Sequence, residues 1–575
     1  MRIDRLVVKN FRNLADVDLR LEPGSVVVGE NGVGKSNLLH AIRLVLDPSL
    51  SSQERNLSRD DFWDGLSDST VNWDPMAAEE VIMISVELVE FEDQHALVAV
   101  LGDALVPGDP MRARLTYLFA PRDTGSLDPG ATVSYQAQLF GGENADKPLH
   151  PDLRGYLCLV FLPALRDVET DLNNYRRSPL RTLLEAAASA VPTSELDAVR
   201  QAMKDANEKV NDLGEIKQVA VNISKRIADI VGANQALETE LAVAADDPLR
   251  LIRNMKLFVD GPAHRRLGTT SLGTLNVLYL ALLELGLEHK LRTADIAHVV
   301  MAIEEPEAHL HPHMQRSVFR RLLNPDDTDR TTLVTTQSPH IASVAAPRSL
   351  VVLREVDGQT TAASAHEAEL TDAEWDDIAR YLDATRAELV FARRVLLVEG
   401  YAEQVLLPAL ARTRGLDLDK AGVTVCAIHG THFTTYARFC EALKIPWAVV
   451  TDADLTDHGV SEGVRRAEKL LAVIRKTGPR EQHGIFVGTT TFEYDLLTAG
   501  GDNVNHCFAT LTELKQTMHH HDLVQAWGST APDLTAFMDR IDAVGGKGRF
   551  AQRLALRDLR APGYIARALD YLGRQ

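Results

Sequence analysis

The stretch GENGVGKS at Gly29–Ser36 decides the fold of the amino-terminal part of the chain. It fits the pattern G-x-x-x-x-G-K-[ST] at every fixed position. The apolar stretch Ser25–Val28 precedes it, and the apolar-periodic stretch Asn37–Leu46 follows it. A strand, a glycine-rich turn and a helix in this order form a phosphate-binding loop. The sequence therefore predicts an α/β domain that binds a nucleoside triphosphate at this loop.

Each residue type in the loop has an expected role in binding ATP. Glycines let the backbone turn tightly and aim N–H groups at phosphate oxygens. Lys35 supplies positive charge to the β- and γ-phosphates, and Ser36 offers a hydroxyl to Mg²⁺. The helix that follows presents its positive N-terminus to the phosphates. The nucleotide-binding residues predicted here are Gly29, Asn31, Gly32, Gly34, Lys35, Ser36 and Asn37, and Ser36 is also a predicted metal ligand.

A second stretch, VVMAIEEP at Val299–Pro306, carries two acids to the end of an apolar strand. Ligands of α/β sheets bind at such carboxyl ends. Glu304 is expected to orient Mg²⁺ through water, and Glu305 is the predicted catalytic residue that polarises the attacking water. The stretch TTQSPHI ends a later strand and suggests that His340 contacts the γ-phosphate.

Two further motifs place acids behind apolar strands in the carboxy-terminal half. LLVEGYAEQ carries Glu399 and, four residues later, Glu403, whereas VVTDADL carries Asp452 and Asp454. Any one of these acids alone would be read as a helix cap or a turn residue, but the ordered set favours a metal site. Hard oxygen ligands suit Mg²⁺ or Mn²⁺. Two such ions about 3.5–4 Å apart could clamp the attacking and leaving oxygens of a phosphodiester.

The amino-terminal motifs resemble those of the ABC-type ATPases of DNA repair and chromosome maintenance. NFRNL with GENGVGKSNLL resembles their amino terminus, and EEPEAHLHP resembles their Walker B motif and D-loop. SLGTLN is similar to their signature motif, although it departs from the Ser-Gly-Gly-Gln core. The resemblance implies that two heads sandwich ATP, with Ser271 and Gly273 acting in trans. Glu304 stands where that family has an aspartate, so the Mg²⁺ geometry is expected to differ.

The carboxy-terminal motifs resemble the Toprim domain of topoisomerases, primases and nucleases. A head followed by Toprim is the layout of the OLD (overcoming lysogenization defect) nuclease family, and the resemblance covers essentially the whole chain. It implies that Glu493 of TFEYDLL is a further metal ligand, with Asp495 of the same stretch as a weaker candidate. It also implies that Lys547 of GGKGRFA stabilises charge on the phosphate. The catalytic residues expected in this half are Glu399, Glu403, Asp452, Asp454, Glu493 and Lys547, of which the five acids are the metal ligands.

The chain of 575 residues exceeds what one hydrophobic core supports. The predicted fold class is α/β: an ABC-type ATPase head with β-rich and helical insertions, followed by a Toprim α/β domain. The head is predicted at 1–390, with a β-rich insertion at 50–150 and a helical, dimerising section at 165–265. The Toprim domain, with a helical end, is predicted at 391–575. The helices of 180–245 read equally well as an arm or dimer surface and as an ordinary packed subdomain.

The composition of the chain indicates in which cellular compartment the protein functions. The formal net charge is −20, which disfavours adhesion to DNA over the whole surface but not in a local basic groove. No apolar run is long enough to span a bilayer, and the first residues lack the features of a signal peptide. The chain is therefore predicted to be cytoplasmic, with no membrane partner. The four scattered cysteines form no CxxC pair, so neither a disulfide framework nor a zinc site is expected.

The sequence thus predicts an ATP-regulated, divalent-metal-dependent DNA endonuclease or nickase in anti-phage defence or DNA processing. Its expected partners are double-stranded DNA and a second copy of the chain, in a homodimer or higher oligomer. The OLD family includes the nuclease subunit of the Gabija system, which implies a UvrD-like helicase as a further partner. The alternative is a nucleotide-sensing scaffold whose nuclease requires such a partner. A topoisomerase would need a tyrosine nucleophile, and no tyrosine here has a context that marks it.

Overall fold

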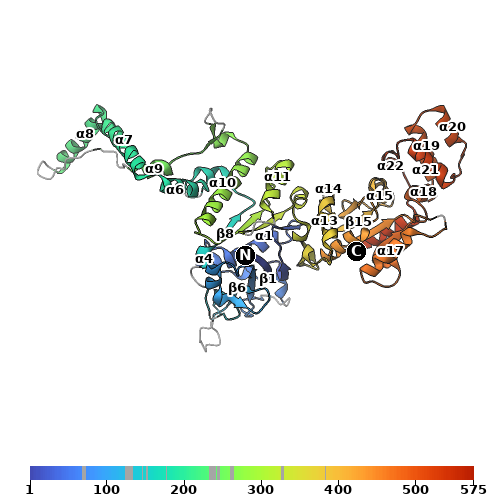
Figure 1. Ribbon diagram of the computed structural model, residues 1–575, viewed down its shortest axis with the longest axis horizontal. Coiled ribbons are helices and arrows are strands. Elements are labelled where there is room, and N and C mark those ends of the chain that lie inside the picture. The colour runs from blue at the N-terminus through green and yellow to red at the C-terminus, as the bar shows by residue number, and fades with distance from the viewer. Residues whose placement is uncertain are drawn as a thin grey trace. The chain divides into compact units, whose positions relative to one another are not determined.

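The computed structural model describes residues 1–67, 73–122, 134–145, 147–149, 153–175, 178–231, 241, 247–259, 265–324, 329–382, 384–456 and 458–574. The chain divides into two compact units (Figure 1). The first, here called the main unit, comprises Met1–Ala164, Ala297–Glu307 and Pro312–Gln575. The second, here called the helical unit, comprises Leu165–Ile296 and Ala308–His311. Among the described residues, no helix has both the length and the apolar character needed to cross a membrane.

A mostly parallel sheet carries the nucleotide motifs of the main unit. Its strand order is β14-β13-β3-β12-β11-β8, and β14 alone of these pairs antiparallel to its neighbour. The strands are β3 (Ser25–Gly29), β8 (Leu157–Leu162), β11 (His298–Glu304), β12 (Arg330–Thr336), β13 (Leu350–Val356) and β14 (Gln359–Ser364). All five residues of β3 are buried, as expected of a central strand of a parallel sheet. The phosphate-binding loop leaves β3 and leads into α1 (Lys35–Leu46).

An antiparallel sheet forms a second layer of the head, and α1 packs against both sheets. Its order is β2-β1-β4-β6-β5, with β7 also paired to β6. The strands are β1 (Arg2–Phe11), β2 (Leu14–Arg20), β4 (Ile82–Val89), β5 (Leu105–Val106), β6 (Arg112–Pro121) and β7 (Tyr135–Gly141). Buried and exposed residues alternate along β2, so this sheet has one covered and one solvated face. Apolar side chains of both sheets and of α1 form one core.

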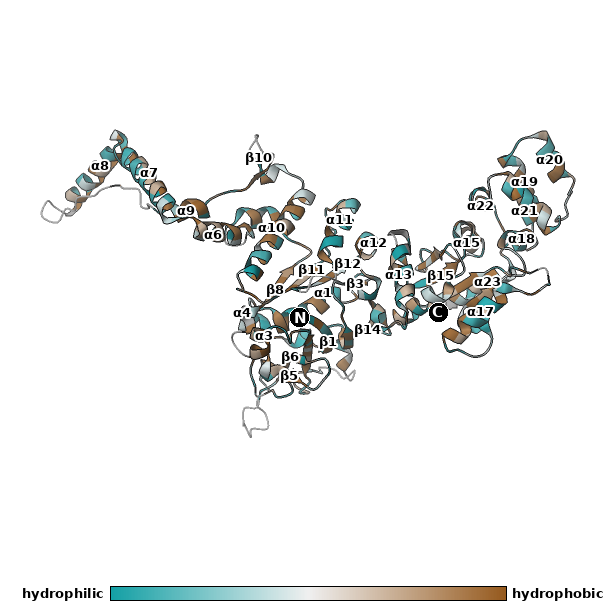
Figure 2. Cartoon of the chain, in the orientation of Figure 1, coloured by the Kyte–Doolittle hydropathy of each residue, from teal (hydrophilic) through white to brown (hydrophobic). Residues whose placement is uncertain are grey.

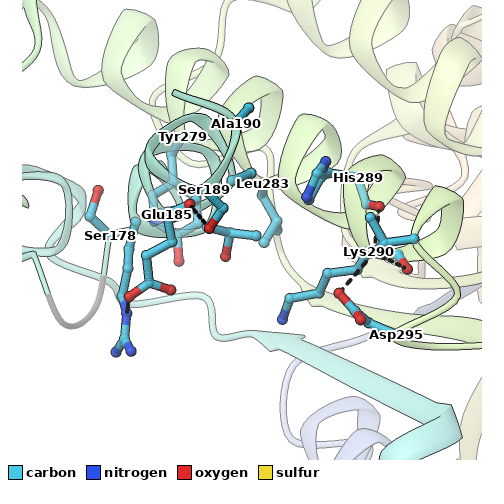
Figure 3. A pocket seen from close by; sticks show the side chains of 14 residues that line it. Ser178, Glu185, Ser189, Ala190, Tyr279, Leu283, His289, Lys290 and Asp295 are labelled. Atoms are coloured by element: carbon cyan, nitrogen blue, oxygen red, sulfur yellow. Dashed lines mark hydrogen bonds and ion pairs between the residues drawn. The ribbon is translucent and has the colours of Figure 1, made fainter. Parts of the chain in front are cut away.

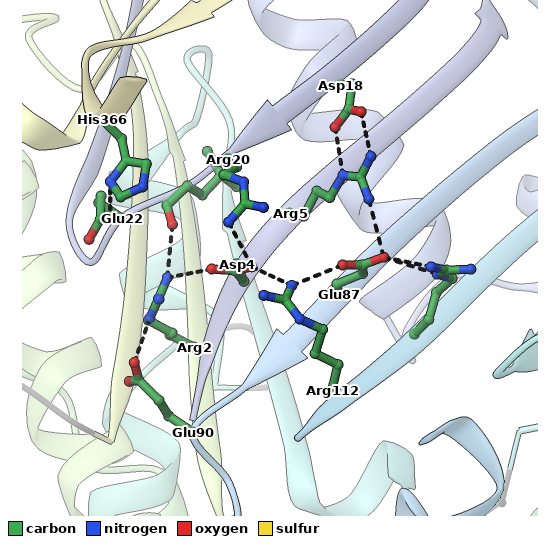
Figure 4. A network of polar contacts seen from close by, with 12 residues as sticks. Arg2, Asp4, Arg5, Asp18, Arg20, Glu22, Glu87, Glu90, Arg112 and His366 are labelled. Atoms are coloured by element: carbon green, nitrogen blue, oxygen red, sulfur yellow. Dashed lines mark hydrogen bonds and ion pairs between the residues drawn. The ribbon is translucent and has the colours of Figure 1, made fainter. Parts of the chain in front are cut away.

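Arginines surround two buried acids on the polar face of the antiparallel sheet (Figure 4). Arg112 Nη1 lies 2.7 Å from Asp4 Oδ2 and 3.2 Å from Glu87 Oε2. Arg114 Nη2 lies 2.9 Å from Glu87 Oε1. Arg112 is therefore the arginine that contacts both buried acids and links the strands that carry them.

The helical unit is built mostly from helices. These are α5 (Val168–Asn173), α6 (Leu180–Ala190), α7 (Thr193–Asn211), α8 (Gly214–Val231), α9 (Pro248–Arg253) and α10 (Leu272–Arg292), with the short strands β9 (Phe258–Val259) and β10 (Arg265–Arg266). A small core joins α5 to α10 through Val168, Leu172, Leu275 and Leu282. By contrast, no residue of α6 or α7 is buried, and Figure 2 shows hydrophilic and hydrophobic residues interspersed along α7 and α8. Whether this surface joins two copies of the chain stays a prediction.

The carboxy-terminal part of the main unit is an α/β domain with an all-parallel sheet. The strand order is β16-β15-β17-β18. The strands are β15 (Arg394–Val398), β16 (Val423–Ala427), β17 (Trp447–Thr451) and β18 (Ile485–Val487). Helices of this part include α15 (Tyr401–Thr413), α16 (Phe433–Ala442), α17 (Glu462–Val473), α18 (Phe492–Leu497), α19 (Asn503–Leu514), α20 (Met518–Gln525), α21 (Leu534–Ala543), α22 (Lys547–Leu554) and α23 (Gly563–Arg574). A single apolar core links the sheet to the terminal helices.

Candidate functional site

The phosphate-binding loop has the backbone conformation that its glycines predict. Gly32 has φ 80 and Gly34 has φ 100, in the left-handed region that favours glycine. A Cβ on Gly34 would lie 2.6 Å from Asn13 Oδ1, so only glycine allows this close approach. Asn13 in turn donates to the carbonyl oxygen of Gly32 (3.1 Å). The strand-turn residue Asn13 therefore braces the loop, a role the sequence did not mark.

Lys35 is buried and already points along the loop. Its Nζ donates to the carbonyl oxygens of Gly29 (2.9 Å) and Glu30 (3.0 Å). The same ammonium lies 3.6 Å from Glu305 Oε1. The predicted phosphate-binding lysine and the predicted catalytic acid are thus adjacent.

Ser36 and Glu304 are also brought together, although 268 residues separate them. The Ser36 hydroxyl donates to Glu304 Oε1, and the backbone N–H of Ala164 lies 3.4 Å from Glu304 Oε2. A hydroxyl and a carboxylate are the hard oxygen donors that Mg²⁺ prefers. The glutamate is long enough to touch the serine directly, where a shorter side chain would leave room between them.

Gln337, which sequence reasoning passed over, reaches this site. Its Nε2 donates to Asn31 Oδ1 and to Glu305 Oε1, each at 2.6 Å, and its backbone N–H donates to Glu307 Oε1 (2.7 Å). His340 instead lies in the short helix α12 (Pro339–Ala342). Among the described residues, no hydrogen bond joins the His340 side chain to the loop. The sequence could have marked Gln337 by its position, because it directly follows the strand β12.

The signature-like residues lie in the helical unit and have local structural roles. Ser271 caps α10, with its Oγ accepting from the backbone N–H of Thr274 (3.2 Å). A Cβ on Gly273 would lie 2.5 Å from the carbonyl oxygen of His309, so this close approach requires glycine. Their expected action on ATP in trans stays a prediction.

The acids of the carboxy-terminal half gather at the carboxyl ends of neighbouring parallel strands. Glu399 follows β15, Asp452 follows β17, and Glu493 lies in the first turn of α18, after β18. Glu403 lies in the first turn of α15. These three strands are adjacent in the sheet, which is why residues far apart in the chain converge.

Glu403, Asp452 and Glu493, here called the buried acid group, are 7%, 6% and 1% exposed. Burial, reinforced by the charges of Glu399, Glu403 and Glu493, raises the pKa of Asp452 to about 8. Burial, together with the charges of Glu493 and Glu399, raises the pKa of Glu403 to about 7. Ionisation of all three acids is therefore disfavoured in this buried place, and a cation bound beside them would relieve that cost.

Lys547 stands at the start of α22 beside the buried acid group. Its Nζ lies 3.0 Å from Glu493 Oε2, in an ion pair. Burial opposes the ammonium, but the charges of Glu493, Asp452 and Glu403 raise the pKa of Lys547. Close packing of two helices fixes this position, because a Cβ on Gly548 would lie 3.1 Å from the ring of Tyr401. Gln552 Nε2 also donates to Tyr401 Oη (2.6 Å).

Arg466, on α17, binds the two remaining acids and was not predicted. Its Nη2 lies 3.1 Å from Glu399 Oε1 and 2.8 Å from Asp454 Oδ2. Glu399 Oε1 also accepts from the Thr451 hydroxyl and from the backbone N–H of Asp452 (3.0 Å). Glu399 and Asp454 are here called the arginine-bound pair.

Asp495, the weaker candidate, has a structural explanation. It accepts hydrogen bonds from the backbone N–H and hydroxyl groups of both Thr489 and Thr490. These bonds shape the turn between β18 and α18. Asp495 is therefore satisfied within the protein.

The donor chemistry of the site fits a divalent cation. Its members offer carboxylate oxygens, and Glu493 Oε2 pairs with the Lys547 ammonium (3.0 Å). Among the described residues, however, no three His, Cys, Asp or Glu side chains stand close enough together to hold one metal ion. Arg466 explains part of this, because it engages two of the five predicted ligands. The assignment of all five acids to a metal centre stays a prediction.

A groove lies between α6 and α10, apart from the two predicted sites (Figure 3). It has a volume of about 800 Å³ and lies wholly within the helical unit. Arg181 on its wall pairs with Glu185 (2.9 Å), so these opposite charges balance. No predicted site residue lines it.

A phosphate-binding head joined to a parallel-sheet domain with acids at its strand ends defines a class: an ATPase coupled to a Toprim domain. Comparisons with known proteins agree. Residues 1–96 and 149–342 match the family model of the AAA ATPase domain. Residues 390–454 match the Toprim domain of overcoming lysogenization defect-like proteins. The first match covers just over half of the chain, and the chain belongs to the AAA ATPase domain family.

Individual relatives are similar to the chain over different lengths. The chain is 26% identical to the OLD nuclease of Thermus scotoductus over 482 residues, which cover 81% of this chain and 85% of the relative. It is 21% identical to the endonuclease GajA of Bacillus cereus, over 81% of this chain and 77% of the relative. The solved carboxy-terminal region of the Burkholderia pseudomallei OLD protein is 30% identical, covers 32% of this chain and 98% of its own, and gives a TM-score of 0.29. The predicted class, an OLD-type nuclease with an ATPase domain, is confirmed.

Proposed function

We propose that this protein is a divalent-metal-dependent DNA endonuclease or nickase whose cutting is governed by ATP at the head. The observation that carries the proposal is the buried acid group beside Lys547. Three buried acids with a lysine at their edge are a costly arrangement for stability alone. A site that binds a metal ion and a phosphodiester explains why the chain tolerates it.

In this proposal Glu403, Asp452 and Glu493 would supply carboxylate ligands to Mg²⁺ or Mn²⁺. A bound divalent ion supplies Lewis-acid stabilisation of charge on the phosphodiester. Lys547 is the residue of this chain that stabilises the same charge directly, because its ammonium already stands at the edge of the acids. Glu399 orients the turn after β17 through its bond from the backbone N–H of Asp452.

At the head, Lys35 and the loop bind the ATP phosphates, Ser36 and Glu304 hold Mg²⁺, and Glu305 polarises the attacking water. Gln337 orients Glu305 by donating a hydrogen bond to it. The sandwich of ATP between two heads is supported by the family resemblance, and it requires a homodimer in which Ser271 acts in trans. Double-stranded DNA is the proposed substrate, in anti-phage defence or DNA processing.

The direct test is plasmid cleavage by the full chain with Mg²⁺ or Mn²⁺. Asp452→Asn and Lys547→Ala are expected to lower the cutting rate by about 10²–10³-fold, because each removes charge stabilisation at the phosphate. Glu468→Ala is the matched control, since Glu468 is an exposed acid on α17. ATP binding should be unchanged in all three variants. Full cutting by both site variants would defeat the assignment.

A second candidate function is a nucleotide-sensing scaffold whose nuclease acts only with a partner, such as a helicase. The arginine-bound pair favours it, because Arg466 already neutralises two predicted metal ligands. Steady ATP turnover by the purified chain, without cutting of any plasmid form, would favour this candidate over the first. Cutting that begins on addition of a helicase would identify the partner class.

A further inference from the structure

The segment that joins α9 to α10 in the helical unit is strongly basic. From Pro248 to Thr270 the sequence contains five lysines and arginines and a single acid, Asp260, although the whole chain has a formal net charge of −20. The five cations are all exposed, and they are here called the basic tract: Arg250, Arg253, Lys256, Arg265 and Arg266. A local excess of positive charge on an acidic protein attracts a polyanion.

The cations of the basic tract differ from those of the neighbouring helices α7 and α8. On α7, Arg200 pairs with Asp197, and at the start of α8 Lys217 pairs with Asp212 (2.9 Å). Within the part of the chain that the structure describes, no ion pair joins an acid to the members of the tract other than Arg265. A solvated face of mixed charges, the ordinary explanation of surface cations, therefore describes α7 but not the tract.

The end of α9 forms a small groove against the start of α6. The groove has a volume of about 90 Å³, and Arg253 and Lys256 line it together with Ser178. Arg181 also lines it and is already paired with Glu185 (2.9 Å). No acid stands among the described residues that line this groove. Two cations and a hydroxyl at one concave place are the kinds of donor that bind phosphate oxygens.

The strands β9 and β10 carry the other end of the basic tract. In their antiparallel pairing Arg266 is opposite Phe258, and Arg265 is opposite Val259. Residues directly opposite each other lie on the same face of a ribbon, so Arg266 shares a face with Phe258, which is 46% exposed. This ribbon thus presents charge beside apolar surface. A nucleic-acid backbone has the matching pattern, because sugars separate its phosphates.

We propose, on the basis of the proposed function, that the basic tract is a binding surface on the helical unit for the sugar-phosphate backbone of double-stranded DNA. The tract holds the duplex without reading its sequence, since contacts to phosphates position a duplex but carry no sequence information. The basic segment directly precedes Ser271, the cap of α10. Bound DNA therefore stands next to the residue that is predicted to act on ATP in trans.

The test measures how salt weakens DNA binding by the full chain. Fluorescence anisotropy follows binding of a labelled duplex over a series of NaCl concentrations, in EDTA so that no metal-dependent cutting occurs. Lys256→Ala and Arg266→Ala are the variants, because both side chains are exposed and lie outside the α-helices. Each should make the slope of log affinity against log salt shallower by about 0.9, and the double variant by about 1.8. A duplex of unrelated sequence should give the same changes.

Lys204→Ala is the matched control, since Lys204 is exposed on α7 of the same unit, and its slope should equal that of the unchanged protein. An equal loss of slope in this control overturns the inference, because the charge of the whole unit then acts rather than the tract.

The remaining outcomes separate the inference from the proposed function. Unchanged slopes in Lys256→Ala and Arg266→Ala, with normal duplex binding by the unchanged protein, overturn the basic tract and leave the proposed nuclease standing. Failure of the unchanged protein to bind any duplex overturns the inference and the proposed substrate together. A labelled polyglutamate peptide that loses affinity in both variants, while duplex binding does not change, identifies an acidic protein as the partner and overturns the inference.

Discussion

The ion pair between Glu30 and Arg393 is expected to transmit the nucleotide state of the head to the Toprim centre. Glu30 lies inside the phosphate-binding loop, and Arg393 directly precedes β15, the strand that ends at Glu399. Arg393 Nε and Nη2 lie 2.5 Å and 2.8 Å from the two carboxylate oxygens of Glu30. Arg354 of β13 also donates to the carbonyl oxygen of Arg393 (2.9 Å). We expect a shift of the loop on binding ATP to act on the start of β15 through this ion pair.

The strength of the ion pair between Glu30 and Arg393 depends on how far its side chains are exposed to water. The side chains of Arg393 and Glu30 are 63% and 53% exposed, so water screens their attraction. Exposed pairs of this kind contribute about 0.2–1 kcal/mol. Because 1.4 kcal/mol corresponds to a factor of ten, the pair can change the effect of ATP on cutting by at most about fivefold. Global stability should change by no more than the same amount.

A double-mutant cycle measures the coupling. Plasmid cleavage is followed with and without a non-hydrolysable ATP analogue for the unchanged protein, Glu30→Ala, Arg393→Ala and the double variant. Each single variant should lose most of the nucleotide effect, and the double variant should lose no more than either. Nucleotide affinity is measured alongside as a control, since Glu30 lies in the loop. Independent, multiplying effects of the two substitutions would refute the coupling.

Three further predictions concern other parts of the main unit. Arg112→Ala should lower the free energy of unfolding by about 2 kcal/mol in urea denaturation, because it removes the guanidinium that contacts both buried acids, although Arg2 and Arg114 still pair with them. Arg20→Ala should cost less than about 1 kcal/mol, because Arg20 is half exposed and lies 3.9 Å from Asp4. Burial lowers the pKa of His298 to about 3, so below pH 6.5 the unfolded chain binds more protons at this residue than the folded chain does. The free energy of unfolding should therefore fall by about 2 kcal/mol between neutral pH and pH 5. His298→Asn should make the free energy of unfolding less dependent on pH over this range. Gln337→Ala should lower kcat for ATP hydrolysis about tenfold with KM nearly unchanged, because it removes the hydrogen bond to Glu305. Gln337→Glu should lower kcat further, because it places a like charge against Glu305. Unchanged turnover in both variants would show that Gln337 has no part in the reaction.

The local sequence was sufficient to predict the helices and strands that carry the motifs. The stretch Leu275–Leu287 predicts a helix, and α10 extends it to Leu272–Arg292. The stretch Trp447–Thr451 predicts a strand and is β17. Hydrophobic periodicity and glycine-rich turns report the backbone conformation of neighbouring residues, which is why these elements and the acids at their ends could be read directly. The pairing of an ATPase head with an OLD-type Toprim domain was instead predicted from the resemblance of these motifs to those of known families.

The contacts within each site were decided by tertiary structure. Gln337 reaches the phosphate-binding loop, because the end of β12 lies beside the end of β3 in the sheet, whereas the contact of His340 with the γ-phosphate stays a prediction. Arg466 looks like a surface residue of an amphipathic helix until the glycine contact of α17 brings it against Glu399 and Asp454. A motif identifies a residue by its neighbours in the chain, but a charge is neutralised by whatever the fold brings within a few ångströms. The sequence thus determined which acids approach the site, and the packing of distant segments determined which of them already have a cation.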